Sequence, residues 1–228
     1  MTSHVIPVRP GNPYPLGRHV NHDERSRAFP YVPPREVALR TLAHRSYGLP
    51  LDQGQLGSCT GNAVAGACNT VPVHATGDPV LTESDAIAIY HIATNLDPFE
   101  GSYPPDDTGS DGLSACRAAV RLGHINSYRH CFSIGDALQA LQYHPVITGV
   151  NWYQDMFYPT RDGFVHPTGG LAGGHEFVVR GYVIAKRPYV LCMNSWGTGW
   201  GISGKFKLFV DEWEKLLGEQ GDAIVVLK

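Results

Sequence analysis

The sequence predicts an α+β fold in which helices come first and strands second. Between residues 59 and 143 apolar side chains recur at helical spacing. From residue 145 onward, short β-branched and aromatic runs are separated by Gly, Pro and Asp. The chain has 228 residues, 43% hydrophobic and 17% charged, which is enough apolar material for one large domain or two lobes sharing an interface. This order of elements is typical of segregated lobes.

The first 45 residues predict an extended arm, followed by a domain over residues 46–228. Prolines occupy positions 7, 10, 13, 15, 30, 33 and 34, and proline breaks helices and withholds a donor from a sheet. We expect the arm to pack along the outside of the domain or, as the alternative, to cover a cleft.

Four helices are predicted in the first lobe, over about residues 55–144. Residues 59–68 have small side chains and predict a tightly packed, buried helix, and residues 83–94 have apolar side chains at helical spacing. The third helix spans residues 111–122, with Asp111 as its cap and Gly123 at its end. The fourth begins near Ser133 and ends near Tyr143.

The second lobe, over about residues 145–228, is predicted to consist of strands. The candidate strands are residues 146–152, 176–185, 189–194, 205–210 and 223–227. A cleft between two such lobes is a natural place for a functional site.

Composition excludes several classes of partner. The net charge of −3 gives no electrostatic case for nucleic acid or an anionic membrane. The sequence contains no run of about 18 apolar residues, so no membrane span is predicted. It also has no apolar segment near Met1, so no secretion signal is predicted. We therefore expect synthesis in the cytoplasm, with the final location open between a virion and release by lysis. The five cysteines lack framework spacing, which predicts reduced thiols, and no residue spacing predicts a metal or cofactor.

Cys59 lies in a setting that favours a reactive thiol. Glycine and serine precede it, and the predicted helix of small residues begins with it. Free amides and the dipole at a helix N-terminus favour an anion, which would lower the pKa of the thiol below its usual value of about 8.5. The Cys59 backbone amide and the Gln53 side chain could then hold an oxyanion. The alternative is a small buried hydrophobe.

His175 and Asn194 are the candidate partners of this thiol. His175 follows two glycines and enters an apolar run, and Asn194 ends another. A cysteine activated by a histidine, whose ring is oriented by an amide, is a known arrangement for acyl transfer. The alternatives are a core histidine with satisfied hydrogen bonds and a turn-forming asparagine.

Three motifs resemble those of papain-like cysteine peptidases, in their bacterial and viral branch. Residues 52–63 are DQGQLGSCTGNA, residues 174–182 are GHEFVVRGY and residues 194–201 are NSWGTGWG, in the family's order. The resemblance covers about residues 45–228. It implies a two-lobed fold, with a helical lobe, an antiparallel β-barrel-like lobe and an active-site cleft between them.

The resemblance also implies a role for each matched residue. Cys59 would attack the scissile carbonyl, and His175 would hold the proton and pass it to the leaving amine. Asn194 would orient the imidazole, Trp196 would shield their hydrogen bond from water, and Gln53 would donate to the oxyanion.

Several cleft-lining residues follow from the same resemblance. They are Ser110, Asp111 and Gly112 on one side and Gly174, Glu176 and Trp196 on the other. Glu176 stands where small residues are usual, at the pocket for the second residue before the scissile bond. We hypothesise that it favours a basic side chain there.

The resulting prediction is a thiol protease that acts on peptides or proteins through a thioester, without a cofactor. One alternative is a hydrolase of cell-wall peptides or isopeptide bonds that uses the same residues. Another is a catalytically silent structural or binding module, with association in a larger assembly left open.

Overall fold

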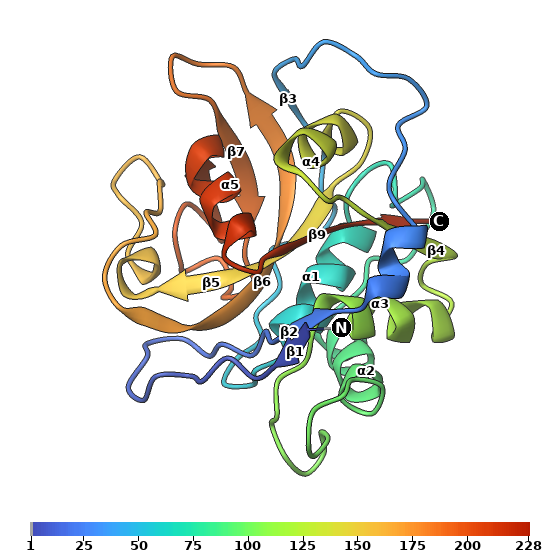
Figure 1. The fold of residues 1–228 in the computed structure, drawn as a ribbon, viewed down its shortest axis with the longest axis vertical. Helices are drawn as coiled ribbons and strands as arrows, with labels where there is room; N and C mark the ends of the chain where they lie inside the picture. The colour runs from blue at the N-terminus through green and yellow to red at the C-terminus, as the bar shows by residue number, and fades with distance from the viewer. Residues whose placement is uncertain (1) are drawn as a thin grey trace.

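The computed structural model describes residues 2–228 as two lobes with the N-terminal arm between them (Figure 1). The helices are η1 (Glu24–Ala28), α1 (Cys59–Cys68), α2 (Glu83–Thr94), α3 (Gly112–Arg121), α4 (Ile134–Leu141), η2 (Gln154–Phe157) and α5 (Val210–Gly218). The strands are β1 (Thr2–His4), β2 (Val20–His22), β3 (Leu42–Ala43), β4 (Ser127–His130), β5 (Val146–Tyr153), β6 (Leu171–Val183), β7 (Tyr189–Met193), β8 (Lys205–Phe209) and β9 (Asp222–Leu227).

The helical lobe is built around α1, all of whose residues are buried. Its small side chains let α2 and α3 approach closely. A Cβ atom at Gly61 would lie 3.0 Å from the backbone nitrogen of Tyr90 and would overlap the carbonyl of Ala86, both on α2. The glycine is therefore required by the packing, although it lowers helix propensity.

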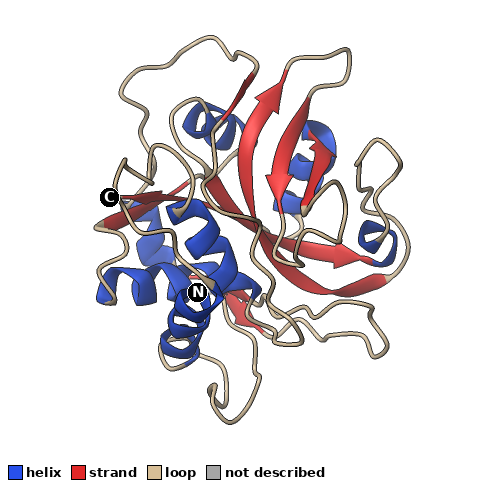
Figure 2. Cartoon of the chain, turned by 180° about the vertical axis from the view of Figure 1, so that it is seen from behind, coloured by secondary structure: helices blue, strands red, loops and turns tan. Residues whose placement is uncertain are grey.

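The β lobe is one antiparallel sheet in the order β4-β9-β5-β6-β7-β8, with β3 paired to β6. Seen from behind, its strands curve around the helix α5 (Figure 2). Trp152, Phe206 and Trp213 fill the core of this lobe and are almost completely buried. Alternation of inward and outward side chains along each strand produces this arrangement.

The central strands serve both lobes, because their two faces are buried in different cores. Ile147, Val178 and Ile224 belong to the core of the helical lobe, whereas their neighbours Val179 and Val225 belong to the core of the β lobe. The sheet is therefore the wall that the two lobes share.

Helix α5 and the extent of β6 differ from the sequence expectation. Trp213 and Leu216 are buried at helical spacing on α5, in a segment for which no helix was predicted. Strand β6 begins at Leu171, before the predicted residue 176, and includes a glycine-rich stretch. Helix α4, within the range predicted for the helical lobe, packs against β5, β6 and α5.

Other sequence expectations concern cysteines, metals and membranes. All five cysteines are buried and unpaired. Within residues 2–228, no cluster of His, Cys, Asp and Glu has the geometry of a metal site. None of the described helices is long and apolar enough to span a bilayer.

Candidate active site

Cys59 is the first residue of α1 and is completely buried. The loop before it is held by Asp107, whose Oδ2 accepts a 2.8 Å hydrogen bond from the Gly57 amide. Within the first turn, Nδ2 of Asn62 donates to the carbonyl oxygen of Ser58 at 2.9 Å. These contacts fix the end of the helix from which the thiol projects.

His175 lies on β6, directly opposite Val150 of β5. Its Nε2 is 2.7 Å from Oδ1 of Asn194, and the same oxygen accepts a 2.8 Å hydrogen bond from the Ser195 amide. Because Oδ1 is an acceptor, Nε2 must carry the hydrogen of the neutral ring. Nδ1 is buried and has no hydrogen-bond partner within residues 2–228, so this nitrogen is free to accept a proton.

Two tryptophans enclose the imidazole. The ring of Trp196 stacks on His175 with a centroid distance of 4.6 Å, and Trp152 meets it edge-on at 4.9 Å. Trp196 therefore lies where the sequence predicted a shielding indole. Trp152 was not predicted, because a tryptophan inside a strand pattern gives no indication of what it will face.

The loop that carries Gln53 is tied to the loop that follows Asn194. The backbone amide of Gln53 donates to the backbone carbonyl of Ser195 at 2.9 Å, and Oγ of Ser195 donates to the side-chain oxygen Oε1 of Gln53 at 2.7 Å. This contact orients the side chain so that Nε2 donates to Leu56 at 2.7 Å and faces the carbonyl of Pro15 at 3.5 Å. The supporting role of Ser195 was not predicted from the sequence.

The structure brings Cys59 to the strand that carries His175. Helix α1 packs against β6, and the Glu176 backbone amide lies near enough to the Cys59 thiol to favour its ionised form. Since Nδ1 of His175 has no partner, no hydrogen bond joins it to the thiol in this arrangement.

The N-terminal arm fills the groove above these residues. On one side, the amides of Gly17 and Arg18 donate to the carbonyl of Gly174 at 3.2 and 3.0 Å. On the other side, the Ser110 amide donates to the carbonyl of Gly17 at 2.8 Å, and the His19 amide donates to the carbonyl of Ser110 at 2.7 Å. Ser110 and Gly174, both predicted to line a cleft, thus bind a segment of this chain.

Further contacts fix the arm near the histidine. Tyr14 stacks on Trp196 with centroids 4.7 Å apart. Residues 16–20 are all buried, and the Gly17 amide, like that of Glu176, lies near enough to the Cys59 thiol to favour its ionised form. This part of the arm lies in the groove and not along the outside of the domain.

The predicted lowering of the thiol pKa is wrong for this arm-covered state. Burial, together with the nearby Glu176 carboxyl, raises the pKa of Cys59 to about 12, although the amides of Glu176, Gly17 and Thr60 oppose the shift. Burial also lowers the pKa of His175 to about 4, against the effect of the hydrogen bond that its Nε2 donates to Asn194. Both groups are therefore neutral. Loss of hydration destabilises their charged forms by more than the helix terminus and the nearby amides stabilise them.

The remaining predicted cleft residues have distinct places. Asp111 caps α3 through a 2.9 Å hydrogen bond from the Ser114 amide to Oδ1, and its Oδ2 accepts from Asn21 of the arm at 3.1 Å. Gly112 lies against the side chain of Glu176, which is completely buried. Glu176 therefore points away from solvent, into the interior beneath the groove.

The chain is similar in sequence to a known protein family and to individual cysteine proteinases. A model described as "Papain family cysteine protease" matches residues 90–217, a range that includes His175 and Asn194 and begins after Cys59. A cathepsin B-like cysteine proteinase of Schistosoma japonicum is 28% identical over 122 residues, covering 48% of this chain and 36% of that protein. A gut-specific cysteine proteinase of Caenorhabditis elegans is 39% identical over 67 residues, or 28% and 20% of the two chains. The chain thus spans about a third or less of these relatives.

Solved structures of low identity share the fold. Xylellain, a cysteine protease from Xylella fastidiosa, superposes with a TM-score of 0.78 at 19% identity, covering 97% of this chain and 99% of that chain. Bromelain from Ananas comosus, in complex with the E64 inhibitor, gives a TM-score of 0.60 at 14% identity, with coverage of 82% and 99%. The two-lobed α+β architecture predicted from the sequence is confirmed.

Proposed function

Since the chain belongs to the papain family of cysteine proteases, we propose that it hydrolyses peptide bonds in peptides or proteins. The observation that carries the proposal is the 2.7 Å contact between His175 and Asn194, which leaves Nδ1 as the free ring nitrogen, on the strand against which the helix that begins at Cys59 packs. A satisfied core histidine would have partners at both nitrogens, and this one does not.

The proposed reaction proceeds through a thioester. Nδ1 of His175 takes the thiol proton as Sγ of Cys59 bonds to the scissile carbonyl carbon, and the imidazolium then gives this proton to the leaving amine as the C–N bond breaks. Water, deprotonated by the same nitrogen, adds to the thioester and releases the carboxylic acid and the thiol. Asn194 holds the ring in the required tautomer throughout.

The negative charge on the tetrahedral intermediates is assigned to two donors, the Cys59 amide and Nε2 of Gln53. In support, Ser195 fixes the Gln53 amide with its nitrogen facing the Pro15 carbonyl of the arm. A substrate carbonyl would replace that of Pro15 when the arm leaves the groove.

The arm-covered state is proposed to be latent. The thiol and imidazole are neutral, they are not hydrogen-bonded to each other, and Gly17 occupies the space next to the sulfur. The arm presents an amide N–H to the thiol, and an amide nitrogen is not a site of nucleophilic attack. Activity therefore requires the arm to move.

Labelling with an epoxide probe for cysteine proteases tests the proposal. The wild-type chain and a variant with a loosened arm, Gly17→Ala, are treated and mapped by intact and peptide mass. We expect one adduct on Cys59, lost in Cys59→Ala and kept in Cys131→Ala, a change at another buried cysteine. If neither chain is labelled, or if the adduct persists in Cys59→Ala, the catalytic proposal fails and the structural-module alternative replaces it.

A further inference from the structure

The arm places a completely buried arginine beside the active site. Arg18 follows Gly17, whose amide contacts the sulfur of Cys59, and its side chain turns down into the protein. Its Nη2 is 2.6 Å from Oδ2 of Asp222 and donates to the carbonyl of Gln220 at 2.8 Å. A fully buried guanidinium is rare unless charged or polar partners surround it.

Two glycines, which have no side chain, create the recess that holds this arginine. A Cβ atom at Gly149 would lie 2.6 Å from Nε of Arg18 and 2.7 Å from both Oδ2 of Asp222 and Oε2 of Glu176. A Cβ atom at Gly112 would overlap Oε1 of Glu176 and lie 3.2 Å from Oδ1 of Asp222. The two glycines therefore leave room where the guanidinium and two carboxyl groups converge.

The recess contains two carboxyl groups, and Arg18 forms an ion pair with only one of them. Nε and Nη1 of Arg18 and both carboxyl oxygens of Glu176 have no hydrogen-bond partner within residues 2–228. Burial and the nearby Asp222 carboxyl raise the pKa of Glu176 well above its usual value, so Glu176 is protonated, and the ion pair of Arg18 is with Asp222. The sequence hypothesis gave this role to Glu176 alone. Asp222 was missed because it is 46 positions further along the chain, on another strand.

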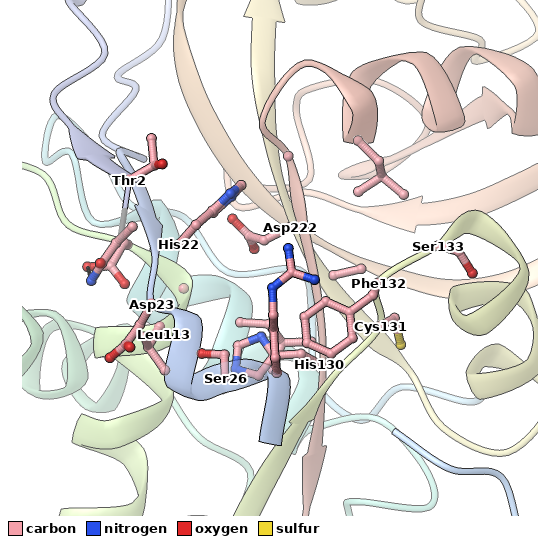
Figure 3. Close-up of a pocket in the computed structure, with 18 of the residues that line it drawn as sticks. Thr2, His22, Asp23, Ser26, Leu113, His130, Cys131, Phe132, Ser133 and Asp222 are labelled. Carbon is pink, nitrogen blue, oxygen red and sulfur yellow. Dashed lines mark hydrogen bonds between the residues drawn. The ribbon is translucent and has the colours of Figure 1, made fainter. Parts of the chain in front are cut away.

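A cavity of about 570 Å³ adjoins the recess. Asp111, Gly112 and Asp222 belong to its wall, and residues 21–23 of the arm form part of the opposite side. Figure 3 shows that Asp222 and the arm residue His22 both belong to its wall. Lifting the arm would therefore open the recess and this cavity together, and a long side chain could enter from the groove.

We propose that this recess is the specificity pocket of the enzyme, that it binds an arginine side chain of the substrate through Asp222 with Glu176 beside it, and that Arg18 occupies it as a built-in substitute. The proposal rests on the proposed peptidase function and assigns its substrate class. Arginine fits better than lysine because a planar, forked donor can reach Asp222, Glu176 and the Gln220 carbonyl together. An apolar side chain would leave Asp222, whose side chain is only 16% exposed, without an ion-pair partner.

Binding is measured first in a chain that cannot turn over. The double variant Arg18→Ala/Cys59→Ala empties the recess and removes the thiol, and its folding is checked by circular dichroism. Two acetylated peptides are titrated by calorimetry, identical except for Arg or Leu at the second residue before the scissile bond. We expect the Arg peptide to bind at least about tenfold more tightly. Adding Asp222→Asn should abolish the difference, Glu176→Gln should reduce it less, and the control Glu214→Gln at the far side of the cavity should keep it.

The second measurement follows labelling of Cys59 in the otherwise wild-type chain by epoxide probes that carry Arg or Leu at the same position. Faster labelling by the Arg probe, with the ratio lost in Asp222→Asn, supports the proposal. Equal binding of both peptides, failure of both to bind, or a ratio unchanged in Asp222→Asn overturns it. If only labelling fails while the Arg peptide still binds selectively, the catalytic proposal falls and the arginine recess stands.

Discussion

One added methyl group should open the groove. A Cβ atom at Gly17 would overlap the carbonyl oxygen of Gly57 and lie 2.6 Å from its carbonyl carbon, in a backbone segment fixed by Asp107. Neither backbone has free space, so Gly17→Ala destabilises the docked arm without changing any charge. Overpacking of this kind costs about 1–3 kcal/mol, which corresponds to an increase of about 5- to 150-fold in the open population.

The assay is the rate at which iodoacetamide modifies Cys59, followed by peptide mass. If the thiol reacts only in the open state, the rate in Gly17→Ala should increase by the same factor. Gly199→Ala is the matched control, because a Cβ atom there meets nothing within 4 Å, and it should react like the wild type. A folded Gly17→Ala variant that reacts no faster than the wild type would refute the claim that the docked arm protects the thiol.

Three further outcomes are expected. The docked arm should open in acid: the pKa of His175 falls from 6.5 to about 4 on burial, so its contribution to the closed state is complete above pH 6.5 and is lost as the pH falls through 4. Hydrogen exchange of residues 9–20, corrected for intrinsic rates, should show this. His175→Gln should weaken the pH dependence, and the remainder is assigned to His19 and His22 of the arm, whose pKa values burial also lowers. Asn194→Ala should lower kcat by about a hundredfold with KM little changed, measured on a chain with a loosened arm. Trp152→Ala should lower the free energy of unfolding in urea by about 3–5 kcal/mol, whereas Tyr158→Ala, at a side chain that is 71% exposed, should change it by less than about 0.5 kcal/mol.

Local sequence patterns were sufficient for most of the fold. The helix that begins at Cys59 and the strands after residue 145 follow from spacing alone, because small or apolar side chains at a fixed period have few other arrangements. Helix α5 was missed because its first residue, Val210, was read as the end of the apolar run of β8; in the structure Trp213 and Leu216 of the helix are buried.

The features of the site that were missed depend on contacts between distant residues. Arg18 and Asp222 are 204 positions apart, and no local pattern relates them. The direction of the Cys59 pKa shift also reversed, because a helix terminus is visible in the sequence but the burial imposed by the arm is not. The contact between His175 and Asn194 was expected, because the motifs around these residues resemble those of papain-like peptidases.

The short sheet formed by β1 and β2 makes the groove-filling segment a loop that is secured at both ends. Thr2 pairs with His22 and His4 with Val20, while residues 7–11 are exposed. A single proteolytic cut in that exposed stretch would leave two pieces, each still held by a strand and one still bearing the buried arginine. Maturation by cleavage would therefore need a second cut beyond β2, or dissociation of the paired strands, and one nick should leave the enzyme silent.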